Sequence, residues 1–477
     1  MVFPIVGGDG KPTGYEIENS MRFNDANANR FQRTPSSAGS RRTFTYSCWV
    51  KLSDIGNRSA LLHTSGGDNN TNFEWIIHQN GYLMLGLQSF NVFETNMLFR
   101  DPSAWYHIVL RMDTTEGSSD NRTKLYVNGN RITSFSATNL NSISQNFDFG
   151  VGVSGTAMAL GSTASGGDPI GGYMSEINFV DGAALGPDKF GETNDDGVWV
   201  PIEPDVSAYG TNGFFLEFKG TGFDVNSDGV GADTSGNDNH HGSTNFATDH
   251  ITTDTPTNNF ATMNSVHKSS NGSAALPTFA EGNLSLTFGA DSSTSSTIAP
   301  SKGKWYVEYK QGENTADNQG YPIVGISTTL GGTAGDVIGF RTPDSSNYRG
   351  QLGTTSVNNA FGSARSAGDI FGFYINLDDD ILIVHKNGSD YMGSGASSGL
   401  DWSGGLTTTN QQTGFYHFYG QSNTNNAFTD LVNFGNPPFS ISSSNADANG
   451  YGSFEYSPTL SGTAFYAMCT KNLAEFG

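Results

Sequence analysis

The sequence contains little cysteine, no long apolar run and no recognisable secretion signal. Its two cysteines, Cys48 and Cys469, lie near opposite ends of the 477-residue chain. That number excludes a disulfide framework and a cysteine-based zinc site, so we expect two buried free thiols. No apolar run approaches the roughly 20 residues that cross a bilayer, so membrane insertion is not expected. The opening MVFPIVGGDGKPTGYEIENS lacks a basic stretch followed by an apolar core, which predicts synthesis in a cytoplasm without a signal peptide.

Basic residues are also scarce. The chain has 24 Lys and Arg against 46 Asp and Glu, which gives a net charge of −22. Binding to nucleic acid needs clustered Lys and Arg that neutralise phosphates, so we expect no nucleic acid among the partners. Solubility explains an acidic surface, and so do calcium sites. The charge alone does not decide between these two explanations.

Helical periodicity is missing as well, because no stretch repeats apolar residues every 3.6 positions over three turns. The chain has instead 61 glycines, 12% aromatic residues and only 15% charged residues. Short aromatic and β-branched runs separated by Gly, Ser, Thr and Asn are typical of an all-β protein. Because the chain is too long for one hydrophobic core, we predict two β-sandwich or jelly-roll domains, joined by an extended connector rich in Asp, Asn, Ser and Thr.

Strand and turn signals recur at short intervals in both halves of the chain. In the first half, Arg42–Leu52 is predicted to be a strand, and Asn72–Gln88 is predicted to be a hairpin that turns at Asn80 and Gly81. In the second half, Gly303–Lys310 and Gly368–Gly388 are predicted to form strands. Aromatic residues become rare in between. The predicted divisions are an N-terminal arm (1–20), a jelly roll (21–219), a connector (220–301) and a second β-sandwich (302–477).

Several segments resemble known families. FTYSCWVKLS, WYHIVLRMD and TKLYVNGNRI, in that order, resemble a laminin-G-like (concanavalin A-type) jelly roll. GKWYVEY, VGIS and GDIFGFYINLDDDILIVHKNG resemble a SPRY domain. The opening SMRFNDANANRFQRTPSSAGSRRTFTYSCWVK and the middle segments GADTSGNDNHHGSTNF and DTPTNNFATMNS are similar to virion structural proteins of marine bacteriophages. Those proteins also place a laminin-G-like block before a SPRY-like one, and the resemblance covers most of residues 21–477.

This resemblance implies a virion structural protein, such as a tail fibre, spike or head appendage. Such a protein acts by assembly and by binding a glycan or receptor on the host surface. Its implied partners are other virion proteins, further copies of itself with a trimer favoured, and host surface polysaccharide. A capsid decoration protein without a receptor role is one alternative, and a polysaccharide depolymerase is another. The lack of a signal peptide fits a particle that is assembled in the host cytoplasm and released by lysis.

The segment FDVNSDGVGADTSGNDNHHG (223–242) has the oxygen spacing of a calcium loop in its first half. A helix-loop-helix calcium site also needs a bidentate Glu at position 12, where this chain has Ser235, so that site is excluded. A single calcium ion in a flexible oxygen cage is one hypothesis, with the ligands Asp224, Asn226, Asp228 and Asp233. The alternative is a turn whose Asp and Asn side chains bind their own backbone.

A zinc site at the end of this segment is not expected. His240 and His241 are adjacent, so on an extended chain they point in opposite directions and cannot both chelate one ion. The other histidines are scattered along the chain, and only tertiary folding could bring them near this pair.

Catalytic carboxylates were sought because concanavalin A-type folds also include glucanases. A glycosidase needs two carboxylates that flank the scissile bond. Glu176 and Asp181 are five residues apart, which puts them on opposite faces of a strand. The three acids Asp378–Asp380 are expected to form a charged hairpin tip. We therefore expect no enzyme.

Aromatic side chains could stack on sugars if they are exposed. The tryptophans considered are Trp75, Trp105, Trp199, Trp305 and Trp402. Most tryptophans in strands are core residues, and Trp49 and Trp105 are also expected in the core. Trp402 lies in the loop LDWSGG and is predicted to be the exposed ligand-binding candidate.

Overall fold

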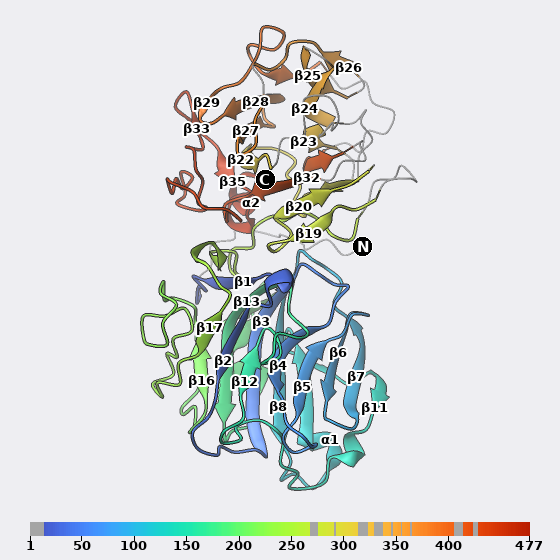
Figure 1. Cartoon of the computed structure of the whole chain (residues 1–477), viewed down its shortest axis with the longest axis vertical. Coiled ribbons are helices and arrows are strands. Elements are labelled where there is room, and N and C mark those ends of the chain that lie inside the picture. The colour runs from blue at the N-terminus through green and yellow to red at the C-terminus, as the bar shows by residue number, and fades with distance from the viewer. Residues whose placement is uncertain are drawn as a thin grey trace. The chain divides into compact units, whose positions relative to one another are not determined.

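The computed structural model describes residues 14–267, 275–290, 292–312, 323–328, 337–344, 347–353, 355–362, 365–404, 414–422 and 428–477. They belong to two compact units, the N-terminal unit (Pro12–Thr257) and the C-terminal unit (Asn258–Gly477). Strands make up nearly all of the regular secondary structure of both units, which confirms the predicted all-β class (Figure 1). In this described part of the chain, no helix is long and apolar enough to cross a membrane.

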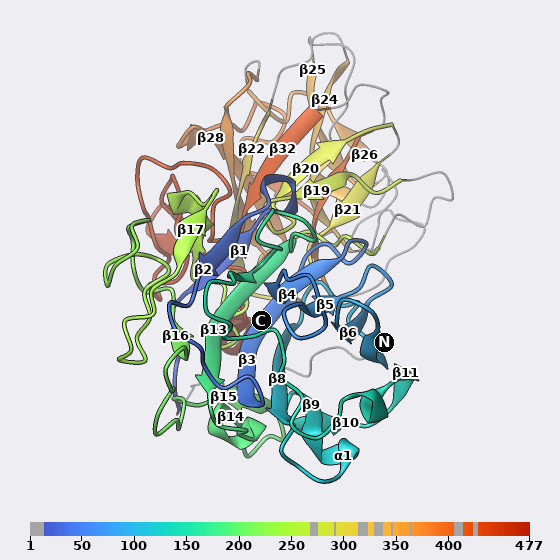
Figure 2. The ribbon, with the colours of Figure 1, turned by 60° about the horizontal axis from the view of Figure 1, so that its bottom comes forward.

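The N-terminal unit is a sandwich of two sheets, each with eight strands among the described residues. The first sheet contains, in spatial order, β10 (Asn130–Ile132), β9 (Thr123–Val127), β8 (Trp105–Asp113), β3 (Thr43–Leu52), β13 (Gly172–Asp181), β1 (Ser20–Phe23) and β18 (Ile251–Thr252), with β16 (Phe214–Leu216) paired to β13. The second contains β11 (Phe135–Thr138), β7 (Asn91–Leu98), β6 (Tyr82–Gly86), β5 (Phe73–Ile77), β4 (Ser59–Thr64), β12 (Met158–Leu160), β2 (Arg30–Arg33) and β17 (Gly242–Thr244). Figures 1 and 2 show β13, β3 and β8 side by side.

Alternating side chains build the core between these sheets. In β3 the residues that point inward are Phe44, Tyr46, Cys48 and Val50, as the sequence predicts, and all four are fully buried. Phe44 lies 5.9 Å, ring centre to ring centre, from Phe73 of the opposite sheet and meets it edge to face. Such aromatic contacts stabilise a sandwich beyond the area that they bury. Cys48 and Cys469 are free and buried, which confirms the expectation for the thiols.

The first sheet is covered on its outer side. Phe190 and Tyr209 pack there against Val109, Val180 and Phe215 of the sheet. The segment that supplies this cover includes the hairpin of β14 (Gly191–Thr193) and β15 (Trp199–Pro201). The outer side of this sheet is therefore a second apolar layer.

The segment 220–301, expected to be a connector, is divided between the two units. In the N-terminal unit, β17 extends the second sheet by pairing with β2, and β18 extends the first sheet by pairing with β1. Lys51 and Asp254 form an ion pair of 2.8 Å there, with both side chains only 1% exposed. Of the expected N-terminal arm, residues 1–13 lie outside the described residues. Its described end belongs to the same unit, where Ile17 donates its amide to Thr257 at 3.2 Å.

The C-terminal unit also contains two main sheets. One comprises β19 (Thr278–Ala280), β20 (Ser285–Phe288), β32 (Phe428–Asn433), β22 (Lys304–Lys310), β27 (Ile370–Asn376), β28 (Ile381–Lys386) and β29 (Ser389–Asp390), with β30 (Leu400–Asp401) and β35 (Tyr466–Ala467) paired to it. The other comprises β21 (Ser293–Ser295), β31 (His417–Gln421), β23 (Ile323–Ser327), β24 (Val337–Asp344), β25 (Asn347–Leu352) and β26 (Thr355–Val357). A small hairpin joins β33 (Thr459–Leu460) to β34 (Thr463–Ala464). The acids Asp378–Asp380 lie in the turn between β27 and β28, as predicted.

Helices are few and short in the described residues. The α-helices are α1 (Ser119–Arg122) and α2 (Thr470–Phe476). The 3-10 helices are η1 (Asp25–Asn27), η2 (Leu140–Ser142), η3 (Pro187–Lys189) and η4 (Thr248–His250).

Candidate functional site

The outer face of the second sheet of the N-terminal unit carries a row of polar and small residues across neighbouring strands. The strand register places Ala159 beside His63, His63 beside Glu74, Glu74 beside Gly86, and Gly86 beside Asn91. In β5 the inward positions are apolar core residues, so the alternation of a strand turns Glu74 to the outside. This face therefore differs from the outer side of the first sheet, which is apolar and covered.

A small apolar patch lies next to this row. It consists of Ala60, Ile76 and Met84, which occupy neighbouring positions on three strands and are packed on by Tyr82. On the next strand, β7, Glu94 lies directly beside Met84 in the strand register. Ala60, Ile76 and Met84 are at most 3% exposed, so they support the polar side chains from below, and Tyr82 is the partly exposed apolar side chain of this group.

Arg58 connects the polar row to the apolar patch. Its guanidinium lies 2.9 Å from Asp168 and 3.6 Å from Glu74, and one of its nitrogens lies 3.9 Å from the Met84 sulfur. The three charged side chains are only 27–29% exposed. Partial burial strengthens such ion pairs compared with fully exposed ones and fixes the guanidinium in place.

An aromatic pair borders the patch. The rings of His78 and Tyr82 are stacked, with centres 4.4 Å apart and planes inclined by 9°. They face each other because the chain turns tightly between β5 and β6, where the amide of His78 donates to the Tyr82 carbonyl at 2.8 Å. This is the turn that Asn80 and Gly81 predict, and Gly81 adopts the positive φ of 87° that favours glycine. A stacked pair at a turn offers a rigid ring face at little entropic cost.

The titratable groups of this face influence one another. Burial lowers the pKa of His63, and it lowers the pKa of His78, where the Arg58 charge acts in the same direction. Both imidazoles are therefore neutral near pH 7. Burial raises the pKa of Glu74, and the charge of Arg58 opposes that shift.

His63 has an unsatisfied polar atom. Its side chain is 7% exposed, and its Nδ1 has no hydrogen-bond partner in the structure. A buried polar atom without a partner costs about 1–3 kcal/mol, so such an atom often marks a place where a further group binds. We call the set of these side chains the outer-face cluster: Arg58, His63, Glu74, His78, Tyr82, Met84, Glu94 and Asp168.

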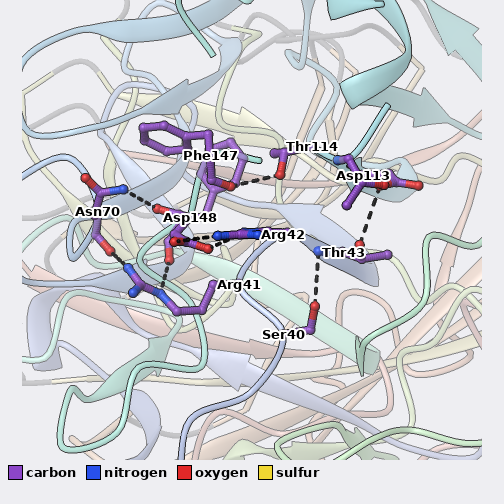
Figure 3. Close-up of polar contacts among 11 residues, drawn as sticks. Ser40, Arg41, Arg42, Thr43, Asn70, Asp113, Thr114, Phe147 and Asp148 are labelled. Carbon is purple, nitrogen blue, oxygen red and sulfur yellow. Dashed lines mark hydrogen bonds and ion pairs between the residues drawn. The ribbon is translucent and has the colours of Figure 1, made fainter. Parts of the chain in front are cut away.

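A second polar group, at one end of the sandwich, has a different character (Figure 3). Arg42 and Asp148 form an ion pair of 2.7 Å. Arg41 donates to the carbonyls of Phe149 and Asn70, and the Asn70 amide group donates to the Asp148 carbonyl at 2.8 Å. These side chains are used to hold three loops together. We therefore assign this group to loop stabilisation.

The residues of the calcium hypothesis do not surround one point. Asp233 is buried, and its carboxylate accepts backbone amides from Phe215, Ser235 and Asn239 at 2.8–2.9 Å. Asp224, Asn226 and Asp228 are exposed, and the Asn226 side chain accepts the Asp228 amide at 2.9 Å. Among the described residues there is no group of three or more His, Cys, Asp or Glu side chains that could hold a metal ion. The geometry is that of the alternative, a turn bound to its own backbone, and calcium binding stays a prediction.

The adjacent histidines do point to different places. His240 accepts the Asp233 amide at 3.0 Å, whereas the ring of His241 packs edge to face on Phe214. Burial lowers the pKa of His241 to about 3, so its imidazole is a neutral core group.

The prediction that Trp402 is exposed is wrong. Its side chain is 4% exposed and belongs to the core of the C-terminal unit. Its indole nitrogen donates to the Tyr416 hydroxyl at 3.2 Å, and its backbone amide donates to Asp380 at 3.0 Å. A short loop with two such anchors folds its aromatic ring inward, where no sugar can stack on it.

The remaining tryptophans are mostly buried as well. Trp75 and Trp305 are fully buried, and Trp49 is 4% exposed. Trp105, expected in the core, is only half-buried, and Trp199 is half-buried too.

The buried His107 superficially resembles a catalytic base. It is stacked between Trp49 and Trp199, and its Nε2 lies 2.9 Å from the Ser47 hydroxyl. Its Nδ1 accepts a hydrogen bond of 3.0 Å from Trp199 and cannot carry the proton. Nε2 is therefore the protonated nitrogen and donates to Ser47, which is the opposite of what a general base does. Burial lowers the pKa of His107 to about 3, so the group is a neutral part of the apolar cover.

The carboxyl groups of Glu176 and Asp181, the catalytic candidates, make contacts within the fold. Asp181 accepts the amides of Ser40 and Asn212 at 2.6 and 2.9 Å. Glu176 is 5% exposed and accepts the Tyr15 hydroxyl at 3.2 Å. Both carboxyl groups therefore have structural roles, and different segments of the chain hold the two side chains.

The outer-face cluster was missed in the sequence, although a signal was present. In NFEWIIHQNGYLMLGLQ the polar and aromatic residues Glu74, His78 and Tyr82 occupy positions of one parity on either side of a tight turn. Strand alternation alone would have placed them on one face. Arg58 and Asp168 could not have been added, because they reach the face from distant loops.

Comparison with known proteins was made on sequence and fold. Residues 25–188 match the family described as the concanavalin A-like lectin/glucanases superfamily. No curated protein matches the chain in sequence.

Three solved structures illustrate the fold similarity. A Bacteroides ovatus protein provisionally named as carbohydrate binding is 16% identical with a TM-score of 0.32, and the match covers 48% of this chain and 58% of that one. The CBM40 of the Ruminococcus gnavus IT-sialidase, bound to alpha2,3 sialyllactose, is 18% identical with a TM-score of 0.21, over 30% of this chain and 89% of that one. The SPRY domain of human HERC1 is 12% identical with a TM-score of 0.22, over 31% of this chain and 87% of that one. The scores are low, and we draw no conclusion about ligands from them. The chain thus contains a laminin-G-like, concanavalin A-type jelly roll within a larger all-β protein.

Proposed function

We propose that this chain is a non-enzymatic structural protein that binds a glycan through the outer-face cluster. The observation that carries the proposal is the stacked pair of His78 and Tyr82 beside the network of Arg58, Glu74 and Asp168. Membership of residues 25–188 in a superfamily that includes lectins supports it.

The chemistry of sugars suits this surface. A pyranose has an apolar face that stacks on an aromatic ring and hydroxyl groups that need hydrogen-bond acceptors and donors. Tyr82 supplies the apolar contact, and Glu74 and Asp168 supply acceptors that Arg58 already holds in position. Because Glu74 and Tyr82 lie on strands and Arg58 and Asp168 are fixed by their ion pair, little ordering entropy is lost when a ligand binds.

The resemblance to phage proteins suggests the setting. We place the chain in a virion that is assembled in the host cytoplasm, as a tail fibre, spike or head appendage that associates with other virion proteins and with copies of itself. Several copies on one particle would bind host polysaccharide by multivalency, so a weak contact per copy would suffice for attachment.

Affinity electrophoresis of the purified chain through gels with immobilised polysaccharides tests the binding. Tyr82→Ala should weaken retention by about tenfold, which corresponds to about 1.4 kcal/mol for a lost stacking contact. Phe415→Ala is the matched control, because it removes a 60% exposed ring from the C-terminal unit. Retention that is equal in Tyr82→Ala and the wild type, or no retention on any polysaccharide, would refute glycan binding by this face. Release of oligosaccharide would refute the non-enzymatic role.

The virion setting needs its own test. Antibody against the chain should label intact particles in electron micrographs of a phage that encodes it. Labelling confined to lysate debris would contradict the setting and leave glycan binding untouched.

A further inference from the structure

The outer-face cluster carries more negative than positive charge. It contains three carboxyl groups, Glu74, Glu94 and Asp168, and one guanidinium, Arg58. With the carboxyl groups ionised, two net negative charges remain. On this basis we infer that the glycan is one without carboxylate or sulfate groups. The inference rests on the proposed function and specifies its ligand.

Arg58 is not free to receive an acidic sugar. Arginine binds carboxylates through paired N–H donors, and here those donors already face Asp168 at 2.9 Å and Glu74 at 3.6 Å. An acidic sugar would have to displace one of these partners and leave a half-buried carboxylate without its cation. The new ion pair would only replace the one that it breaks, so an acidic sugar gains no net charge pairing from Arg58.

The histidines do not compensate for the negative charge. His63 faces Asp168 and Arg58, and His78 faces Arg58, Glu94 and Asp168. In both cases burial is the largest influence on the pKa and lowers it, so both rings are neutral at pH 7. Tyr82, the remaining titratable side chain, faces Glu94 and Arg58 and is uncharged near neutral pH.

Neutral sugars match the hydrogen-bonding groups that are present. Carboxylate oxygens accept hydrogen bonds and cannot donate them, so they suit sugar hydroxyl groups. Gly86 allows the Met84 and Glu74 side chains to lie close over its strand, since a Cβ at this position would lie 3.0 Å from Met84 Cε and 3.2 Å from Glu74 Oε2. The unpartnered Nδ1 of His63 adds one more polar atom to the same row.

The experiment compares two sets of glycans on the same protein. The neutral set contains mannan, dextran and a β-glucan, and the anionic set contains alginate, hyaluronan and alpha2,3-sialyllactose. Dissociation constants are measured by isothermal titration calorimetry at low and at about 0.5 M salt, because salt screens the repulsion. We expect the best neutral glycan to bind at least tenfold more tightly than any anionic one at low salt, and the difference to narrow at high salt.

Charge variants give the matched controls. Asp168→Asn weakens the hold on the Nε donor of Arg58 and removes one negative charge, so anionic glycans should gain at least fivefold in affinity. Asp148→Asn removes the same charge from the loop end and should leave the preference unchanged. Tyr82-dependent binding of an anionic glycan with equal or higher affinity overturns this inference and leaves the proposed function standing. Binding that does not depend on Tyr82, or no binding of any glycan, overturns the proposed function and the inference together.

Discussion

Replacing Glu176 by Gln tests whether a buried carboxyl group makes the N-terminal unit less stable to unfolding as the pH rises. Glu176 directly precedes Ile177 and Glu217 directly follows Leu216, and Ile177 and Leu216 are paired across β13 and β16. Glu176 has a positive φ of 49°, at the point where the register of β13 against β3 shifts. Burial and the charge of Glu217 raise the pKa of Glu176 to about 8, whereas the Tyr15 hydroxyl bond acts in the opposite direction.

The magnitude follows from proton linkage. Between pH 4.5 and pH 8 the folded chain keeps the proton on Glu176, and the unfolded chain loses it. Unfolding then releases a proton, so the free energy of unfolding falls as the pH rises, by about 1.4 kcal/mol per pH unit. The stabilisation is fully present below pH 4.5, the pKa of Glu176 in the unfolded chain, and it is lost once the pH reaches about 8, the pKa in the folded chain. The total over this window is roughly 4–5 kcal/mol, as an upper estimate for one buried group.

Urea unfolding of wild type and Glu176→Gln at pH 5, 6, 7 and 8.5 measures the effect. Gln resembles the protonated acid, so the two proteins should be about equally stable at pH 5. By pH 8.5 the variant should be more stable by about 4 kcal/mol, since its side chain cannot ionise. Glu217→Gln should reduce the pH dependence of the wild type, because the charge of Glu217 is the second largest cause of the raised pKa. A stability difference between Glu176→Gln and wild type that stays constant from pH 5 to 8.5 would refute the reasoning.

Three further substitutions test contacts of single residues. Lys51→Met leaves the Asp254 carboxylate buried without its cation, so the free energy of unfolding of the N-terminal unit in urea should fall by about 3–5 kcal/mol. An additional Asp254→Leu should restore most of this loss. An unchanged unfolding midpoint for Lys51→Met would contradict the buried ion pair. Trp402→Ala should cost the C-terminal unit about 3–5 kcal/mol and leave glycan retention in affinity gels intact, whereas lost retention in a stable protein would restore Trp402 as a ligand contact. Asp233→Asn should destabilise by about 2 kcal/mol equally in calcium and in EDTA, because its carboxylate holds backbone amides. A rise of melting temperature in calcium that disappears in Asp233→Asn would instead support the calcium hypothesis.

Local patterns were enough to predict the strands. Thr43–Leu52 and Phe73–Ile77 are strands because their side chains alternate or form short apolar runs, and turn residues bound them. Asn128 and Gly129 both adopt positive φ, 46° and 75°, which is the conformation that this residue pair predicts for a two-residue hairpin. These features depend on neighbours in sequence, so the sequence alone carries them.

Features that depend on distant segments could not be predicted in this way. Trp402 looked exposed because its loop is rich in glycine and serine, and its burial depends on Tyr416, whose position follows from tertiary packing. Asp233 was included in the calcium hypothesis as a further carboxylate of the same Asp- and Asn-rich segment. In the structure its carboxylate accepts the amides of Phe215, which precedes it in the chain, and of Asn239, which follows it.

The contrast between the two outer faces of the N-terminal unit links the fold to the proposed function. A sandwich needs to bury only the inner faces of its sheets, yet this unit also covers the outer face of its first sheet with Phe190 and Tyr209. On the second sheet the outer face keeps Arg58 and its two acidic partners 27–29% exposed over a small apolar patch. Partly exposed charges that are fixed by one another contribute little to stability, so folding alone does not account for their arrangement. The proposed glycan binding would use this arrangement, and that is why the first experiments belong on this face.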